Sequence, residues 1–121
     1  MKMKCDEAAG MKVGMTDIKH IFILTKTPQS ERARLCLQLA KQSKNAVLYL
    51  AGDGVYNLLA EVAGPCDAPA LAAMPRDRII ACKEDLEARG VQAKDRATVP
   101  DDFYRQLVDE MMQEGSRIYT F

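Results

Sequence analysis

Apolar residues fall into short continuous runs, separated by longer segments in which they recur at helical spacing. The runs His20–Thr25, Ala46–Ala51 and Ile79–Ala81 are typical of strands that are covered on both faces. Arg96–Val99 and Arg117–Phe121 predict two further short strands. We therefore expect a mostly parallel, five-stranded sheet.

The segments between these runs predict helices. The first should extend from Pro28 to about Ser43, with Thr27 as its N-cap. Its apolar stripe has spacings of three and four and contains Ala33, Cys36, Leu37 and Ala40. Further helices are expected over 55–63, between Cys82 and Gly90, and from Pro100 to Gly115. Alternating strands and helices predict an α/β fold with helices on both faces of the sheet.

The chain has 121 residues, which is enough for one core. Residues 18–121 are expected to form this single domain, whereas residues 1–17 show no steady period and predict a flexible tail. Seventeen basic and seventeen acidic side chains cancel, so the charge balance does not favour direct binding to nucleic acid. No apolar run has the length of a membrane span and no signal-peptide pattern is present, so a cytoplasmic location is expected.

The four cysteines are widely spaced, and His20 is the only histidine. This composition does not favour a zinc site, a catalytic triad or a disulfide framework, and we expect no metal, no cofactor and reduced thiols. Cys36 lies on the apolar stripe of the first helix and should be buried. Cys66 lies in a proline-rich loop, and we keep it as a second candidate thiol beside Cys82.

Cys82 is the main candidate for chemistry. It follows the third strand and precedes a short helix, so it should lie at the carboxyl edge of the sheet, where ligands collect in open α/β folds. The helix start and Lys83 should lower the pKa of the thiol. Glu84 and Asp85 lie in the same turn and should raise it. A small apolar side chain that simply ends a strand is the alternative interpretation.

The turn Gly52-Asp53-Gly54 follows the second strand and resembles the opening of a dinucleotide fingerprint. Asn57 stands where the third glycine would be, so the signal for a nucleotide is weak. We interpret Asp53 as a helix N-cap and Gly54 as a source of permissive dihedral angles. The alternative is that Asp53 and Gly54 make polar contacts at the edge of a site.

Three motifs resemble the DsrE/DsrF/DsrH superfamily, and in particular its DsrH/TusB-like branch. They are Lys26-Thr27-Pro28, Asp53-Gly54-Val55-Tyr56 and Glu84-Asp85-Leu86-Glu87-Ala88-Arg89-Gly90. The resemblance covers roughly residues 20–121. It implies a flavodoxin-like three-layer α/β/α fold without cofactors. It also implies a cytoplasmic sulfur-relay subunit, which forms homo-oligomers or assembles with DsrE/TusD-like and DsrF/TusC-like proteins.

The resemblance further implies persulfide sulfur transfer, which serves tRNA 2-thiouridine formation or sulfur metabolism. The superfamily's persulfide cysteine belongs to the DsrE/TusD type and precedes a helix that ends in Arg-Gly. Cys82 stands at that place before Arg89-Gly90, although TusB-type members generally lack the cysteine. Arg89 itself is expected to contact a neighbouring carboxylate or the sheet edge.

Three functional hypotheses follow. The first is a persulfide carrier, a sulfurtransferase component that acts through Cys82. The second is a non-catalytic scaffold subunit of a DsrEFH/TusBCD-like complex. The third is a small-ligand binder that uses Gly52-Asp53-Gly54. Oligomer formation is supported in the sequence by the apolar residues Tyr104, Met111 and Met112 of the last helix.

Overall fold

The computed structural model describes residues 18–62 and 74–121. Its centre is a four-stranded sheet in the order β3-β2-β1-β4, in which every pair of neighbours is parallel. The strands are β1 (Lys19–Leu24), β2 (Ala46–Leu50), β3 (Ile79–Ala81) and β4 (Ser116–Thr120). The parallel sheet predicted from the sequence is therefore confirmed.

The prediction of five full strands is wrong for the described residues. Instead of a strand over 96–99, the structure has one parallel bridge between Thr98 and Ile80. The Thr98 N–H donates to the Ile79 carbonyl at 2.7 Å, and the Ala81 N–H donates to the Thr98 carbonyl at 2.9 Å. Pro100 follows closely and has no N–H to donate, which limits any extension of this pairing.

The strand order also differs from the expected flavodoxin-like arrangement. In flavodoxin-like sheets the first strand lies between the second and the third. Here β1 lies between β2 and β4, and β3 is the edge beyond β2. What the structure shows is a mixed α/β fold with a parallel sheet.

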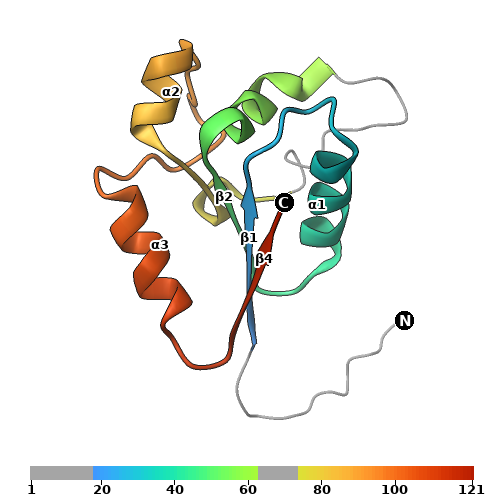
Figure 1. The fold of residues 1–121 in the computed structure, drawn as a ribbon, viewed down its shortest axis with the longest axis vertical. Helices are drawn as coiled ribbons and strands as arrows, with labels where there is room; N and C mark the ends of the chain where they lie inside the picture. The colour runs from blue at the N-terminus through green and yellow to red at the C-terminus, as the bar shows by residue number, and fades with distance from the viewer. Residues whose placement is uncertain (1–17, 63–73) are drawn as a thin grey trace.

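Helices cover both faces of this sheet, with α1 (Glu31–Gln42) on one side and α3 (Phe103–Met111) on the other (Figure 1). Because side chains alternate along a strand, β1 sends Phe22 and Leu24 to the α1 side and Ile21 to the α3 side. Tyr49 and Ile80 join Ile21 beneath α3. The core is thus two apolar layers, one on each face of the sheet.

Helix α1 begins later than predicted. Ser30 is its N-cap, and the Ser30 hydroxyl accepts a hydrogen bond from the Arg32 N–H at 3.1 Å. The expected N-cap, Thr27, instead belongs to a preceding turn in which its carbonyl accepts from the Ser30 N–H at 3.0 Å. Serine is a somewhat better N-cap than threonine, which agrees with the later start.

Two of the remaining helices follow the carboxyl ends of strands: the 3-10 helix η3 (Gly52–Val62) comes after β2, and α2 (Lys83–Arg89) comes after β3. A single 3-10 turn, η5 (Arg76–Arg78), precedes β3 at its amino end. Gly90 ends α2 in the left-handed conformation, with φ of 67°, as predicted. No helix in these described stretches is long and apolar enough to cross a membrane.

Candidate functional site

The carboxyl edge of the sheet is built from the turn after β2 and from helix α2 after β3. The two are joined by Asp85 in the first turn of α2, whose Oδ2 accepts a hydrogen bond from the Gly52 N–H at 2.7 Å. Gly52 has φ of 55°, a conformation that glycine adopts without strain. The end of β2 is thereby fixed against the start of α2.

Arg89 adds a second connection between the same two elements. Its Nε donates to Asp53 Oδ1 at 3.1 Å, and its Nη1 lies 3.4 Å from Asp85 Oδ1. The expected contact between Arg89 and a neighbouring carboxylate is therefore confirmed. Asp53 is not an N-cap, because it lies inside η3 and its carboxylate faces Arg89. The prediction of an N-cap role was wrong, whereas the alternative of a polar contact at this edge holds.

Gly54 is required for space and not for its dihedral angles. A Cβ added to Gly54 would lie 2.0 Å from the carbonyl oxygen of Leu24, at the end of β1. Its φ is not positive, unlike that of Gly52. The reason predicted from the sequence was wrong, and a close approach of two backbones replaces it.

Cys82 occupies the N-cap position of α2 at the end of β3, as predicted. Its N–H donates to the Leu50 carbonyl, and its own carbonyl accepts from the Leu86 N–H, both at 3.0 Å. Only 1% of the residue is exposed, and it belongs to the apolar layer under α3 together with Tyr49 and Phe103. The expectation of an uncovered thiol at the rim of the sheet is wrong for this conformation.

The surroundings of Cys82 favour the neutral thiol. Burial is the largest cause of a raised pKa for this group. The backbone N–H of Asp85 at the helix start acts in the opposite direction, but the carboxylates of Asp85 and Glu84 raise the pKa further. Glu84 Oε1 lies 3.5 Å from the sulfur. The lowering effect expected from the helix start is present and is outweighed.

Lys83 does not compensate for these carboxylates. Its Nζ pairs with Asp101 Oδ1 at 3.5 Å, on the exposed side of the edge. The thiol's charged neighbours that affect its pKa are thus acidic. This arrangement is the opposite of the electropositive surroundings that activate catalytic cysteines.

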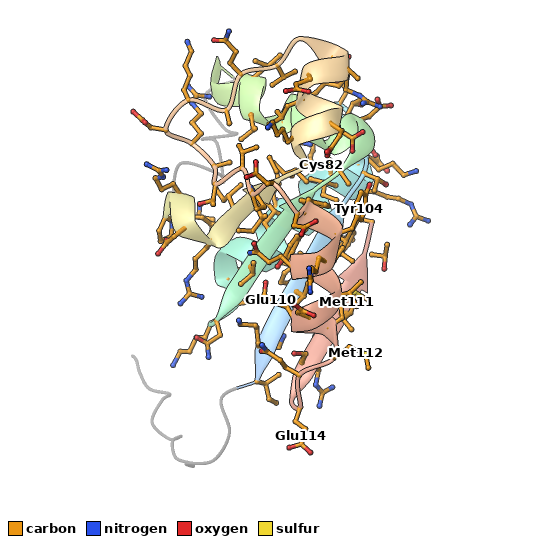
Figure 2. All side chains as sticks on the ribbon, turned by 90° about the vertical axis from the view of Figure 1, so that its left-hand side faces the viewer. Cys82, Tyr104, Glu110, Met111, Met112 and Glu114 are labelled. Atoms are coloured by element: carbon orange, nitrogen blue, oxygen red, sulfur yellow. The ribbon has the colours of Figure 1, made fainter. Side chains whose placement is uncertain are left out.

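Tyr104, in the first turn of α3, is a neighbour of Cys82 that the sequence did not indicate. Figure 2 shows both residues at the same end of α3. The pKa of Tyr104 is raised by burial of its hydroxyl first and then by Cys82. The side chain as a whole is 58% exposed, and its ring packs edge-on against Phe103 with centroids 5.0 Å apart. Tyr104 therefore joins the buried thiol to the protein surface.

The other candidate residues lie away from this edge. Cys36 is fully buried in α1, as predicted, and burial raises the pKa of its thiol to about 12. Cys66 lies outside the described residues. His20 contacts the Tyr119 hydroxyl through Nδ1 at 3.2 Å. In the part of the chain that the structure describes, no cluster of three histidine, cysteine or acidic side chains has the geometry of a metal site.

Sequence reasoning also missed a cavity at the opposite, amino end of the strands. It has a volume of about 720 Å³ and lies between α3 and the starts of β2 and β3. Glu110 lines it, and its carboxylate accepts two hydrogen bonds. One comes from the Tyr49 hydroxyl, and the other comes from Lys19 Nζ, which lies 2.5 Å from Glu110 Oε2. The cavity carries both charge signs, because Lys19, Arg78 and Arg105 share its walls with Asp77, Asp109 and Glu110. Its residues come from distant segments, so no local motif marks it.

Comparison with known families decides the classification. The model of the DsrH-like protein family matches residues 26–116. The chain belongs to the DsrH-like family. The matched region contains the Asp53-Gly54 turn, Cys82 and the whole of α2, so the resemblance predicted from the sequence is confirmed. A search of curated proteins finds no significant match. DsrH-like proteins generally work in complexes with DsrE-like and DsrF-like partners.

Proposed function

We propose that this DsrH-like chain is a non-catalytic subunit of a sulfur-relay complex and that it acts by holding partner proteins. Family membership supports the sulfur-relay assignment. The observation that carries the non-catalytic role is the burial of Cys82, of which 1% is exposed. A sulfur carrier must be reached by both a donor and an acceptor, and this thiol is reached by neither in the observed conformation.

Electrostatics supports the same proposal. The thiolate is the nucleophile in sulfur exchange, and its population falls as the pKa rises. Burial and the two carboxylates raise the pKa of Cys82. In this role Cys82 is a small apolar side chain that completes the layer beneath α3.

A persulfide carrier is the second candidate, and one specific observation favours it. Cys82 lies at the carboxyl end of β3 and at the start of α2, next to the largely exposed Tyr104. In that mechanism the Cys82 thiolate attacks the outer sulfur of a donor persulfide. The donor S–S bond breaks, and the donor leaves as a thiolate. The new cysteine persulfide then yields its outer sulfur to an acceptor thiolate, which regenerates the Cys82 thiolate.

Persulfide loading distinguishes the two candidates. The full chain is incubated with a cysteine desulfurase and cysteine, and intact mass spectrometry follows the addition of a sulfur atom. The matched variants are Cys82→Ser, Cys66→Ser and Cys36→Ser. If the chain is a non-catalytic subunit, no sulfur atom is added at Cys82. No mass increase should then be seen that is lost in Cys82→Ser and kept in Cys66→Ser. An adduct with that dependence contradicts the proposal and establishes Cys82 as the carrier.

Assembly provides the complementary measurement. Co-purification of the chain with DsrE-like and DsrF-like proteins should be unchanged by Cys82→Ser, because a scaffold does not use the sulfur. Loss of sulfur flow through the assembled complex, with assembly itself intact, would contradict a purely architectural role. The acceptor pathway, tRNA 2-thiouridine formation or sulfur metabolism, then follows from the partners that the chain selects.

A further inference from the structure

The cavity at the amino end of the strands lies along one flank of α3. The side chains that α3 contributes recur at spacings of three and four residues, so they share one side of the helix. A second wall is the 3-10 turn η5, which contributes Asp77 and Arg78. The volume of about 720 Å³ lies within the range of about 300–1,000 Å³ that is typical of sites for small organic molecules. The cavity can therefore hold an organic ligand and not only an ion.

Part of the charge in this cavity serves the fold. The Glu110 carboxylate accepts hydrogen bonds from the hydroxyl of the fully buried Tyr49 and from Lys19 Nζ. A buried hydroxyl without a partner would cost free energy, so the core needs Glu110 at this position. Arg105 pairs with Asp102 at 3.9 Å, and both of these side chains are largely exposed. These two ion pairs compensate four of the charged side chains that line the cavity.

Arg78 is a cation without an anionic partner. It is partly buried, and it forms no ion pair with any residue that the structure describes. Its Nη1 donates to the Ala46 carbonyl at 3.3 Å, which holds the head group at the cavity wall. A guanidinium carries several donors in a planar fork, and this contact uses one of them. Because the fork matches the two oxygens of a carboxylate, a carboxylate on a ligand would supply the missing partner.

Two carboxylates that line the same cavity also lack an ionic partner within residues 18–62 and 74–121. They are Asp77, next to Arg78, and Asp109 on α3. Asp101, by contrast, pairs with Lys83, which does not line the cavity. A ligand with only negative charge would be repelled by the two carboxylates, and a ligand with only positive charge would be repelled by Arg78. The cavity therefore fits a ligand that carries one charge of each sign.

The uncharged part of the lining matches a peptide. Asn45, Gln106 and Gln113 supply amide groups, which both donate and accept hydrogen bonds as peptide groups do. Val47 and Ile80 belong to the apolar layer beneath α3 and supply a surface for apolar side chains. A free amino acid has both charges but has no peptide group for these amides. A peptide of a few residues uses all three parts of the lining.

We propose that this cavity is a binding site for short peptides, which it recognises by their two charged termini. The α-carboxylate of the peptide pairs with Arg78, and its α-ammonium group pairs with Asp109. The apolar side chains of the peptide lie on Val47 and Ile80. Cys82 does not line the cavity, so the proposal can fail or succeed independently of the sulfur chemistry.

The first test measures binding of the tripeptide alanyl-leucyl-alanine to the full chain by NMR chemical-shift titration. The N-acetyl derivative and the C-terminal amide of this peptide each lose one charge and keep the side chains. We expect saturable binding of the free tripeptide at millimolar concentrations, and roughly tenfold weaker binding of both derivatives and of leucine alone. Absence of saturable binding overturns the proposal, as does equal binding of the free tripeptide and of either derivative or leucine.

The second test examines the partner of the peptide carboxylate. Arg78→Gln should weaken binding of the free tripeptide by roughly tenfold, because it removes a charge-assisted contact in a partly buried position. Arg76→Gln is the matched control, since Arg76 lies in the same turn, is exposed and does not line the cavity. Circular dichroism shows whether both variants remain folded. Equal weakening by the two substitutions contradicts the assignment of the carboxylate to Arg78.

The third test reverses the charge at Asp109, which is exposed, so that the fold does not depend on it. Asp109→Lys should weaken binding of the free tripeptide by a few-fold, since exposed ion pairs are partly screened. The N-succinyl tripeptide carries a carboxylate in place of the ammonium group, and it should bind to Asp109→Lys more tightly than to the unaltered chain. If the variant does not exchange its preference in this way, the proposed orientation of the peptide is wrong.

Discussion

Arg89 Nε lies 3.1 Å from Asp53 Oδ1, although 36 positions separate the two residues in the sequence. The contact joins two of the motifs that carry the family resemblance, the Asp-Gly turn after β2 and the Arg-Gly end of α2. Asp85 strengthens the connection by accepting from the Gly52 N–H at 2.7 Å. These motifs therefore hold the carboxyl edge of the sheet together, because their polar groups form hydrogen bonds with one another.

The close approach at Gly54 predicts a large loss of stability in Gly54→Ala. The new methyl group would lie 2.0 Å from the Leu24 carbonyl oxygen, so the end of β1 or the start of η3 must move. We expect a decrease of about 3 kcal/mol in the free energy of unfolding, measured by urea denaturation. Gly115→Ala is the control, because no atom of the described residues, other than those of Gly115 and its two chain neighbours, lies within 4 Å of the added group, and only the positive φ of 83° is unfavourable. A loss in Gly54→Ala no greater than in Gly115→Ala would contradict the steric explanation.

Helix α1 allows a direct comparison between the observed and the predicted N-cap. Ser30→Ala removes the acceptor for the Arg32 N–H and should decrease the free energy of unfolding by about 1 kcal/mol. Thr27→Ala should have a clearly smaller effect, because Thr27 takes part in the turn through its backbone carbonyl. Denaturant titration of both variants measures the difference. Equal losses would place the start of the helix at Thr27.

Tyr104 should control access to the Cys82 sulfur. Tyr104→Ala removes the neighbouring side chain, and we expect alkylation of Cys82 by iodoacetamide at pH 8 to become faster by roughly tenfold. Val108→Ala, on the same flank of α3, serves as the control and should leave the rate close to that of the unaltered chain. Peptide mass mapping assigns the modified residue. An unchanged rate in Tyr104→Ala would show that other groups cover the sulfur.

Cys36 predicts a loss of stability at alkaline pH. Burial raises its pKa from 9.0 to about 12, so the folded chain keeps this proton while the unfolded chain releases it. The contribution is fully present below pH 9 and is lost as the pH rises from 9 to 12. The maximum slope is about 1.4 kcal/mol per pH unit. Cys36→Ala should flatten the pH dependence of the free energy of unfolding in this window, and an unchanged slope would contradict the assignment.

Much of the fold could be predicted because the signals are local. The continuous apolar runs predict the buried strands, and the stripe of the first helix predicts the burial of Cys36. Gly90 marks the end of α2 through its left-handed conformation. The prediction of a fifth strand over 96–99 was wrong, because strand formation depends on pairing with a neighbouring strand. In this described segment only Thr98 pairs with β3.

The environment of Cys82 could not be predicted from the sequence, because it is formed by residues that are distant along the chain. Its position at the end of β3 follows from the sequence, but its cover comes from Phe103 and Tyr104 on a later helix. Lys83 is adjacent in the sequence and yet pairs with Asp101. Sequence proximity therefore predicted the acidic neighbours correctly and the basic one incorrectly. Tertiary packing decided the accessibility of the sulfur.

Asp85 serves two purposes with a single carboxylate. It anchors α2 to the Gly52 N–H, and it opposes ionisation of the Cys82 thiol. Any partner that binds this carboxylate and moves it would weaken the attachment of α2 and at the same time lower the pKa of the Cys82 thiol. Loss of the hydrogen bond to Gly52 and a lower pKa of the Cys82 thiol are consequently coupled. A substitution of Asp85 that makes the sulfur more reactive must therefore also weaken the attachment of α2.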